Sequence, residues 1–141
     1  MLRRFSFWLY AAAVMQALSA AFHSISFFVE PVPQNETEKQ LIGLITNYHP
    51  DAGMGFHPSF MQLFTGLSLC FTLLCLFGAS LNWYLKKMHV QPHIFKGVLL
   101  LEIIIFGLLF LAMLAFTFPP PIFCTLLIFV FLCGAYFTCR K

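Results

Sequence analysis

Four runs of apolar residues dominate the pattern of the chain. They cover about residues 5–28, 58–84, 94–118 and 121–137, and "GVLLLEIIIFGLLFLAMLAF" in the third run is apolar on every helical face. A helix needs roughly 20 apolar residues to cross a hydrocarbon core, whereas a barrel strand would alternate apolar and polar positions. The pattern therefore predicts an all-α, four-helix transmembrane bundle whose last span is short or tilted.

The longest connection, residues 29–57, contains a shorter amphipathic segment. Asn35 stands at an N-cap position, and Glu38 follows three residues later, as in a capping box. The apolar side chains of this segment share one helical face: Leu41, Leu44, Ile45 and Tyr48. We expect a short helix on the outer membrane surface or over the mouth of the bundle. Asn35 also opens a glycosylation sequon, but the capping role accounts for the same residues and is preferred.

Charged residues predict the orientation of the spans. Basic residues flank one set of span ends: Arg3, Arg4, Lys86, Lys87, Lys96, Arg140 and Lys141. The connection of residues 29–57 carries the acidic residues Glu30, Glu36, Glu38 and Asp51 against Lys39 alone. Because cationic segments stay on the cytoplasmic side, both termini are predicted to be cytoplasmic and this connection is predicted to lie outside.

The composition leaves no room for a soluble domain. Of the 141 residues, 60% are hydrophobic and only 9% are charged, so we expect one transmembrane domain over residues 1–141. Arg3 and Arg4 before an apolar run could also begin a signal peptide with "SAA" as its cleavage site. The run continues past that point through "FHSISFFV", which favours a retained span.

Polar side chains recur at three- and four-residue spacing in the first two spans. The first stripe consists of Gln16, Ser19, His23 and Ser26. The second stripe consists of Gln62, Thr65, Ser68 and Thr72. Each set lies on one helical face, and polar atoms facing lipid are costly when unpaired. We therefore expect the two stripes to meet, where they either satisfy each other or line a small hydrated pocket.

Glu102 is the one acidic residue inside an apolar run. It lies about 9 Å along the helix from Lys96, too deep for an interface charge. Matching depths along the spans places it near Gln16 and Thr72, with His23 in the outer half of the bundle. Glu102 either fastens the bundle by hydrogen bonding or acts as an acid or base, and both roles stay open. For His23, packing and hydrogen bonding are preferred.

The outer connection also carries His49, Asp51 and His57, which are ligand types for a transition metal. Their spacing lacks the HxxxH or HxxE pattern of a helical site, so we interpret them as an interface connection. The five cysteines contain no CxxC pair, which disfavours dithiol redox chemistry. Two histidines near a boundary, His23 and His57, are weak grounds for haem ligation. No metal or cofactor is expected.

One stretch carries a family resemblance. A histidine late in the first span, a loop with a short helix and then "DAGMGFHPSFMQLFTGLSLCF" resemble an uncharacterised bacterial family of small four-span integral membrane proteins. The resemblance covers about residues 1–85 and implies a bacterial cytoplasmic membrane and a four-span fold, without an established activity. A looser similarity to DoxX-like proteins concerns architecture, which does not determine chemistry.

These features predict a non-enzymatic accessory subunit or a protein that binds a lipophilic small ligand. Its expected partners are the lipid bilayer, a larger membrane complex or further copies of the chain, and a lipophilic small molecule, but not nucleic acid. The alternative is a membrane-embedded enzyme or proton-coupled carrier that uses Glu102 and His23 as acid and base.

Overall fold

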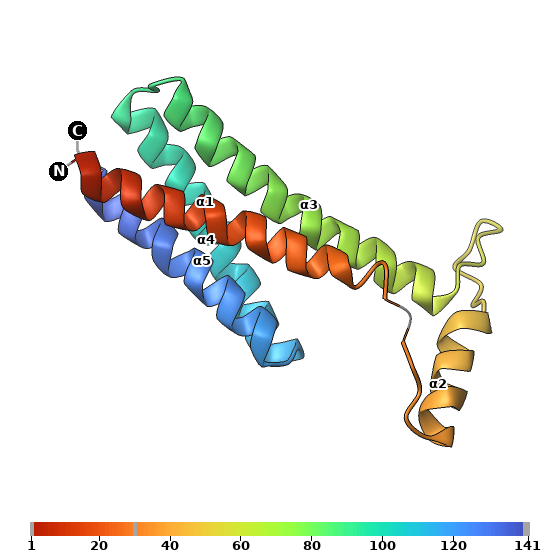
Figure 1. Cartoon of the computed structure of the whole chain (residues 1–141). Helices are drawn as coiled ribbons and strands as arrows, with labels where there is room; N and C mark the ends of the chain where they lie inside the picture. The colour runs from red at the N-terminus through yellow and green to blue at the C-terminus, as the bar shows by residue number, and fades with distance from the viewer. Residues whose placement is uncertain (1, 30, 140–141) are drawn as a thin grey trace. The chain divides into compact units, whose positions relative to one another are not determined.

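The computed structural model describes residues 2–29 and 31–139, and this part of the chain contains helices and no strand (Figure 1). The helices are α1 (Leu2–Ile25), α2 (Glu36–Asn47), α3 (Phe60–Lys87), α4 (Pro92–Phe116) and α5 (Pro119–Thr138). All except α2 are long and apolar enough to cross a membrane. The predicted all-α class is confirmed, as are four helices that could span a membrane and a short additional helix.

Some of the charges behind the predicted orientation cannot be placed. Glu30, Arg140 and Lys141 lie outside the described residues, as does the side chain of Arg3. The cytoplasmic location of both termini therefore stays a prediction.

Prolines begin two of the long helices. The fourth span was predicted to begin at about residue 121, but α5 already begins at Pro119, the first of three consecutive prolines. The N–H groups in the first turn of a helix have no carbonyl acceptor within the helix, so proline fits there without the loss of a hydrogen bond. Pro92 occupies the same position in α4. The connection between α4 and α5 is therefore reduced to Thr117 and Phe118.

The connection between α3 and α4 is closed by a Schellman turn. His89 has a positive φ of 50°, and its N–H donates to the carbonyl of Lys86 at 3.4 Å. The N–H of Val90 reaches back to the carbonyl of Leu85, also at 3.4 Å. This pair of bonds satisfies carbonyls that the end of a helix leaves free. Glycine is the usual residue at this left-handed position, and histidine replaces it here.

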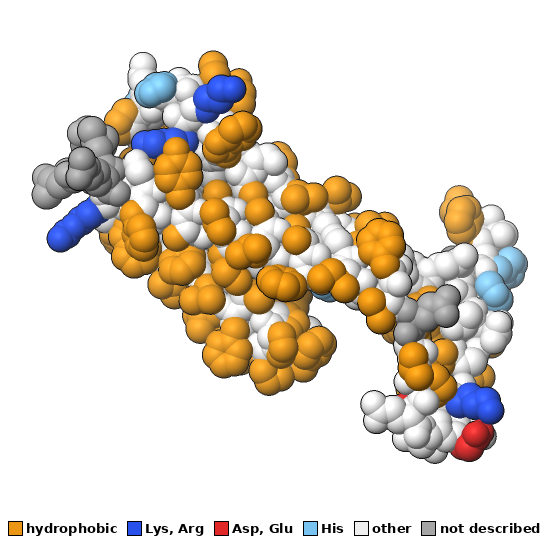
Figure 2. All heavy atoms as spheres, viewed as in Figure 1, with side chains coloured by type: hydrophobic (Ala, Val, Ile, Leu, Met, Phe, Trp, Pro, Cys, Tyr) orange, Lys and Arg blue, Asp and Glu red, His pale blue; other side chains and the backbone are white. Residues whose placement is uncertain are grey.

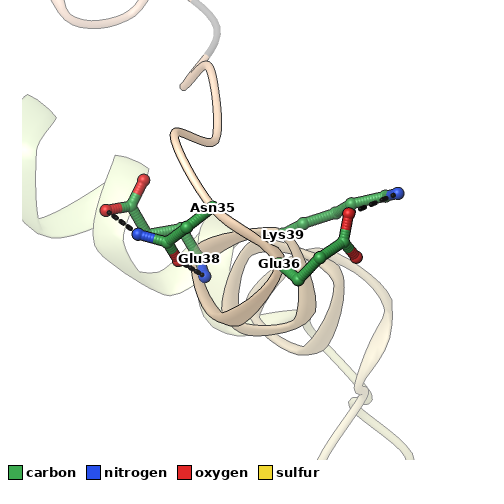
Figure 3. A network of polar contacts seen from close by, with 4 residues as sticks. All are labelled: Asn35, Glu36, Glu38 and Lys39. Carbon is green, nitrogen blue, oxygen red and sulfur yellow. Dashed lines mark hydrogen bonds and ion pairs between the residues drawn. The ribbon is translucent and has the colours of Figure 1, made fainter.

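The predicted cap of α2 is confirmed. Asn35 Oδ1 accepts from the N–H of Glu38 at 2.8 Å, and Asn35 Nδ2 donates to Glu38 Oε1 at 3.2 Å (Figure 3). Glu38 Oε2 accepts from the N–H of Gln34 at 2.7 Å. None of the residues of α2 is buried, and its apolar face stays exposed at Leu41 and Leu44. The helix is therefore stabilised locally by its cap and has an apolar face free for a membrane surface.

The chain divides into two compact units by its internal contacts. The first unit consists of Met1–Ser19 and Leu74–Lys141, and the second unit consists of Ala20–Leu73. The first unit contains α4, α5 and parts of α1 and α3, and the second contains α2. Each unit is described by itself below.

The core of the first unit is built by the inward faces of its helices. Its fully buried apolar side chains include Leu9, Ala12, Cys75, Leu99, Phe106, Ile128, Leu132 and Ala135. Large apolar side chains also cover the outside of the long helices, as the space-filling view shows (Figure 2). Since a membrane helix faces lipid, these exposed leucines and phenylalanines need no further protein contact.

Gly134 allows close contact between α1 and α5 in the first unit. A Cβ atom at this position would lie 2.6 Å from Cδ2 and 2.8 Å from Cε3 of Trp8. The indole therefore lies directly against the α5 backbone, where it also meets the ring of Phe131 at a centroid distance of 6.0 Å. Small residues commonly allow this kind of approach between membrane helices.

We expect Gly134→Ala to lower the thermal stability of the purified protein in detergent. The added methyl group forces the rigid indole of Trp8 away from α5, at a cost of about 1–3 kcal/mol. Gly97→Ala is the matched control, because a Cβ at position 97 meets no atom within 4 Å. The midpoint of thermal unfolding checks the effect. Equal midpoints for the two variants would contradict the close contact.

Candidate functional site

Three polar side chains from three helices meet inside the first unit. Asn82 of α3 donates through Nδ2 to Glu102 Oε2 of α4 at 2.7 Å and to Gln16 Oε1 of α1 at 3.3 Å. The exposed fractions of Gln16 and Asn82 are 0%, and that of Glu102 is 6%. We call these three residues the carboxyl–amide cluster.

The helical spacing of α4 places Glu102 toward the core. Leu99 precedes it by three residues and Phe106 follows it by four, and both are buried. Residues at these separations lie on one face of a helix. The same holds for Gln16, which follows the buried Ala12 by one turn in α1. The core-facing side of α1 therefore includes the polar residue Gln16, and that of α4 includes Glu102.

Gly78 provides the space that Gln16 occupies. A Cβ atom at position 78 would collide with Gln16 Nε2 and would lie 3.0 Å from Gln16 Cδ. It would also lie 3.3 Å from Cε2 of Phe106. The side chain of Gln16 thus lies against the α3 backbone, one turn before Asn82. The cluster is tightly packed on this side.

Several polar atoms of the first unit are buried and have no hydrogen-bond partner among the described residues. They are Gln16 Nε2, Ser19 Oγ, Asn82 Oδ1 and Glu102 Oε1. Leaving such a group unpaired costs about 1–3 kcal/mol. The carboxyl–amide cluster therefore offers an amide donor from Gln16 and acceptors from Asn82 and Glu102. A single hydroxyl group could donate to the carboxylate and accept from the amide.

Among the described residues, no cation forms an ion pair with the carboxyl group of Glu102. Within residues 2–29 and 31–139, the one ion pair joins Lys39 to Glu36 at 3.5 Å, on the surface of α2. An acidic group without a counter-charge is costly at membrane depth, and such residues often mark a functional site. Glu102 thus combines a structural hydrogen bond with a free acceptor oxygen.

The remaining residues of the first stripe lie in the second unit. His23 is half-buried and meets the ring of Phe71 edge-on at 4.8 Å, and its Nε2 has no partner in the described part of the chain. Ser26 is exposed and donates to the carbonyl of His23 at 2.7 Å. Of the packing and hydrogen bonding expected for His23, the structure shows the packing against Phe71, and it shows no hydrogen bond to Nε2 from the described residues.

The residues of the second stripe have different environments. Gln62 is exposed and forms a capping box with Ser59, since Gln62 Oε1 accepts from the Ser59 N–H at 2.9 Å and Ser59 Oγ accepts from the Gln62 N–H at 3.3 Å. Thr65 is exposed and donates to the carbonyl of Met61 at 2.9 Å. The side chains of Gln62 and Thr65 therefore form hydrogen bonds with the backbone of their own helix or its cap, and neither pairs with His23 Nε2.

Deeper in the second stripe, the side chains become less exposed. Ser68 is half-buried, and Thr72 is buried with a hydroxyl that has no partner among the described residues. Thr72 belongs to the second unit, whereas Gln16 and Glu102 belong to the first. The expected proximity of Glu102 and Gln16 is confirmed, and the two are joined by Asn82.

Asn82 is the one member of the carboxyl–amide cluster that the sequence interpretation missed. The predicted second stripe ends at Thr72. Continued by three and four residues, it passes Cys75 and Ala79 and reaches Asn82. Periodicity could therefore have identified Asn82. The contact with Gln16 could not be foreseen, since it depends on the packing at Gly78.

The loop residues His49, Asp51 and His57 close the connection between α2 and α3. The Nδ1 of His49 lies 2.8 Å from the carbonyl oxygen of His57, and Asp51 Oδ1 accepts from the N–H of Gly53 at 2.8 Å. Both Gly53 and Gly55 have a positive φ, as does Met54 between them. In the described part of the chain, no group of three His, Cys, Asp or Glu residues is placed to hold a metal.

We expect a double-mutant cycle to detect the hydrogen bond between Asn82 and Glu102. The single variants Asn82→Leu and Glu102→Leu each strand a buried partner, whereas the double variant removes both polar groups. The coupling free energy should be about 0.6 kcal/mol and at most about 1.7 kcal/mol, the average and the maximum for hydrogen bonds between membrane helices. Unfolding of the purified variants in mixed micelles measures it.

Thr125→Val combined with Glu102→Leu provides the control cycle. Thr125 is also fully buried, but its hydroxyl donates to carbonyls of its own helix, those of Pro121 and Ile122. We expect no coupling in this cycle. A coupling for Asn82 no larger than that for Thr125 would be inconsistent with the carboxyl–amide cluster.

Comparison with known proteins does not assign the chain to a family. No family model, curated protein or solved structure matches the chain. The resemblance to a bacterial four-span family and the DoxX-like architecture therefore stay predictions.

Proposed function

We propose that the protein is a non-enzymatic integral membrane protein that binds the polar head of a lipophilic small molecule at the carboxyl–amide cluster. The supporting observation is the set of buried polar atoms without partners: Gln16 Nε2, Asn82 Oδ1 and Glu102 Oε1. A cluster that only fastened helices would be expected to satisfy its own hydrogen bonds. This one leaves both donors and acceptors for another group.

The chemistry of the cluster favours a ligand with a hydroxyl head. A hydroxyl donates one proton, which Glu102 Oε1 or Asn82 Oδ1 can accept, and it accepts a proton from Gln16 Nε2. Because Gln16 lies against the α3 backbone at Gly78, we propose that only the head group of the ligand, and not the whole molecule, reaches the cluster. The apolar remainder of the ligand would stay among the exposed leucines and phenylalanines of the spans. A membrane alcohol or a quinol meets both requirements.

The expected setting is a bacterial inner membrane with both termini in the cytoplasm. The distribution of basic residues and the resemblance of residues 1–85 support this setting. The only helix too short to span a membrane among the described residues is α2, which has 12 residues. Partner proteins would therefore contact mainly the faces of the spans, as expected of an accessory subunit in a larger membrane complex or an oligomer.

Mass spectrometry of the protein purified with native lipids tests the proposal. We expect a co-purifying hydroxyl-bearing lipophile whose amount per protein falls about tenfold in Glu102→Gln, because a charge-assisted hydrogen bond is lost. Thr125→Val is the matched control and should retain the ligand. The absence of any bound lipophile from the parent protein, or equal retention by Glu102→Gln, would refute the proposal.

A proton-coupled carrier or membrane-embedded enzyme is the second candidate. It is favoured by the lack of a cation beside Glu102 within the described residues, since a proton is the smallest group that can neutralise a carboxylate. In this reading Glu102 and His23 act as acid and base. The half-buried His23 has an unpaired ring nitrogen, as that role requires.

Proteoliposomes with an internal pH-sensitive dye test the carrier. Under an imposed pH gradient, the carrier should move protons, and both Glu102→Gln and His23→Ala should reduce the rate to that of empty vesicles. Glu36→Gln on the surface of α2 is the control and should leave the rate unchanged. Equal rates for the parent protein and both variants would eliminate this candidate.

A further inference from the structure

The start of α1 and the end of α5 lie side by side in the first unit (Figure 1). A cavity opens there, lined by side chains of both helices. Its volume is about 420 Å³, and it is lined by Arg4, Phe7, Trp8 and Thr138. This volume is within the range of clefts that hold small molecules. We call it the Arg4 groove. It shares no lining residue with the carboxyl–amide cluster.

The apolar wall of the Arg4 groove is held in place by contacts with α5. The indole of Trp8 lies against the α5 backbone at Gly134 and against the ring of Phe131. Phe7 meets Trp8 edge-on at a centroid distance of 5.4 Å and is itself 63% exposed. The groove thus has a fixed aromatic wall with an open side. Aromatic side chains of this kind favour the boundary between hydrocarbon and water.

The polar part of the groove consists of a cation and a hydroxyl group. Arg4 is exposed and has no ion-pair partner in the described part of the chain. The Nζ atoms of Lys86, Lys87 and Lys96 each lie over an aromatic ring, at 5.2, 5.6 and 5.0 Å from its centroid. Thr138 Oγ1 donates to the carbonyl of Gly134 at 2.6 Å, so it remains able to accept a hydrogen bond. The guanidinium of Arg4 is therefore available to an anion.

The charge of the whole first unit favours an anionic ligand. Its sequence carries the basic residues Arg3, Arg4, Lys86, Lys87, Lys96, Arg140 and Lys141 against the single acid Glu102. Glu102 is buried and bonded to Asn82, so it does not compete for Arg4. Basic residues beside the end of a membrane helix attract anionic lipids by about 1 kcal/mol each.

We propose that the Arg4 groove binds an anionic phospholipid. The forked guanidinium of Arg4 holds the phosphate, and the first part of an acyl chain lies on Phe7 and Trp8. A phospholipid fits because the groove joins one cation to an aromatic wall at the end of a membrane-spanning helix. The inference goes beyond the proposed function and does not depend on the cluster around Glu102.

Fluorescence of Trp8 in nanodiscs tests this proposal directly. The chain has two tryptophans, and Trp83 is 60% exposed, so Trp83→Phe leaves Trp8 as the only one. Brominated phosphatidylglycerol, diluted into phosphatidylcholine, should quench Trp8 more strongly than brominated phosphatidylcholine does. We expect Arg4→Gln to weaken the apparent affinity for the anionic lipid about fivefold, because one basic contact is lost.

Lys87→Gln is the matched control. Lys87 lies at the end of α3, where the neighbouring Lys86 reaches the ring of Phe5, but it does not line the groove. We expect Lys87→Gln to keep the preference for the anionic lipid. An equal loss in Lys87→Gln and Arg4→Gln would show diffuse attraction to surface charge and would overturn the proposal.

Two further outcomes would also overturn it. Equal quenching by the two brominated lipids would mean that the headgroup is not recognised. Release of quenching by an excess of inorganic phosphate, at constant ionic strength, would mean that the groove binds a free anion. Since Arg4 is exposed, Arg4→Gln is expected to fold, and an unchanged unfolding midpoint verifies this.

Discussion

Polar groups that enter hydrocarbon need partners from the protein, because no water is present there. The architecture follows from this constraint. The backbone is satisfied within helices, and helix ends are completed by caps such as Asn35 and Ser59. Several hydroxyl groups do the same within their own helix: Ser24, Thr65, Thr117, Thr125 and Thr138 donate to carbonyls three or four residues earlier. Against this background the buried atoms without a partner among the described residues are exceptions, namely Ser19 Oγ, His23 Nε2, Thr72 Oγ1 and the three atoms around Glu102. Those around Glu102 come from three helices and lie in one cluster, which is the reason for proposing a binding role there.

The sequence predicts the helices better than it predicts the contacts between them. Four apolar runs and one capping box are local signals, and each corresponds to an observed helix. The observed start of a helix differs from the predicted one where proline occupies the first turn, as at Pro119 in α5. Its spacing assigns Gln62 to a polar stripe, but Gln62 lies in the first turn of α3. Backbone N–H groups there have no acceptor within the helix, so the Gln62 side chain accepts from the N–H of Ser59 and caps the helix. The contact of Asn82 with Gln16 depends on how closely two helices approach, which periodicity does not encode.

The two proposed sites recognise their ligands by different physical means. The carboxyl–amide cluster is buried, so selectivity there would come from the number and direction of hydrogen bonds. The Arg4 groove is open to its surroundings, so selectivity there would come from charge and from contact with aromatic rings. An annular lipid and a specific lipophile could thus bind the same unit together. Neither site draws on the loop of His49 and Asp51, whose side chains are occupied in closing their own turn.

The notch at Gly78 limits how the first unit can move. Gln16 fills this notch, and the positions three and four residues away on the same face of α3 carry the buried side chains of Cys75 and Asn82. A shift of α1 along α3 toward either position would drive the amide of Gln16 into one of those side chains. The contact between Gln16 and Gly78 therefore opposes sliding of α1 along α3. A conformational change that preserved this contact would rotate side chains within the unit while α1 and α3 stayed in register.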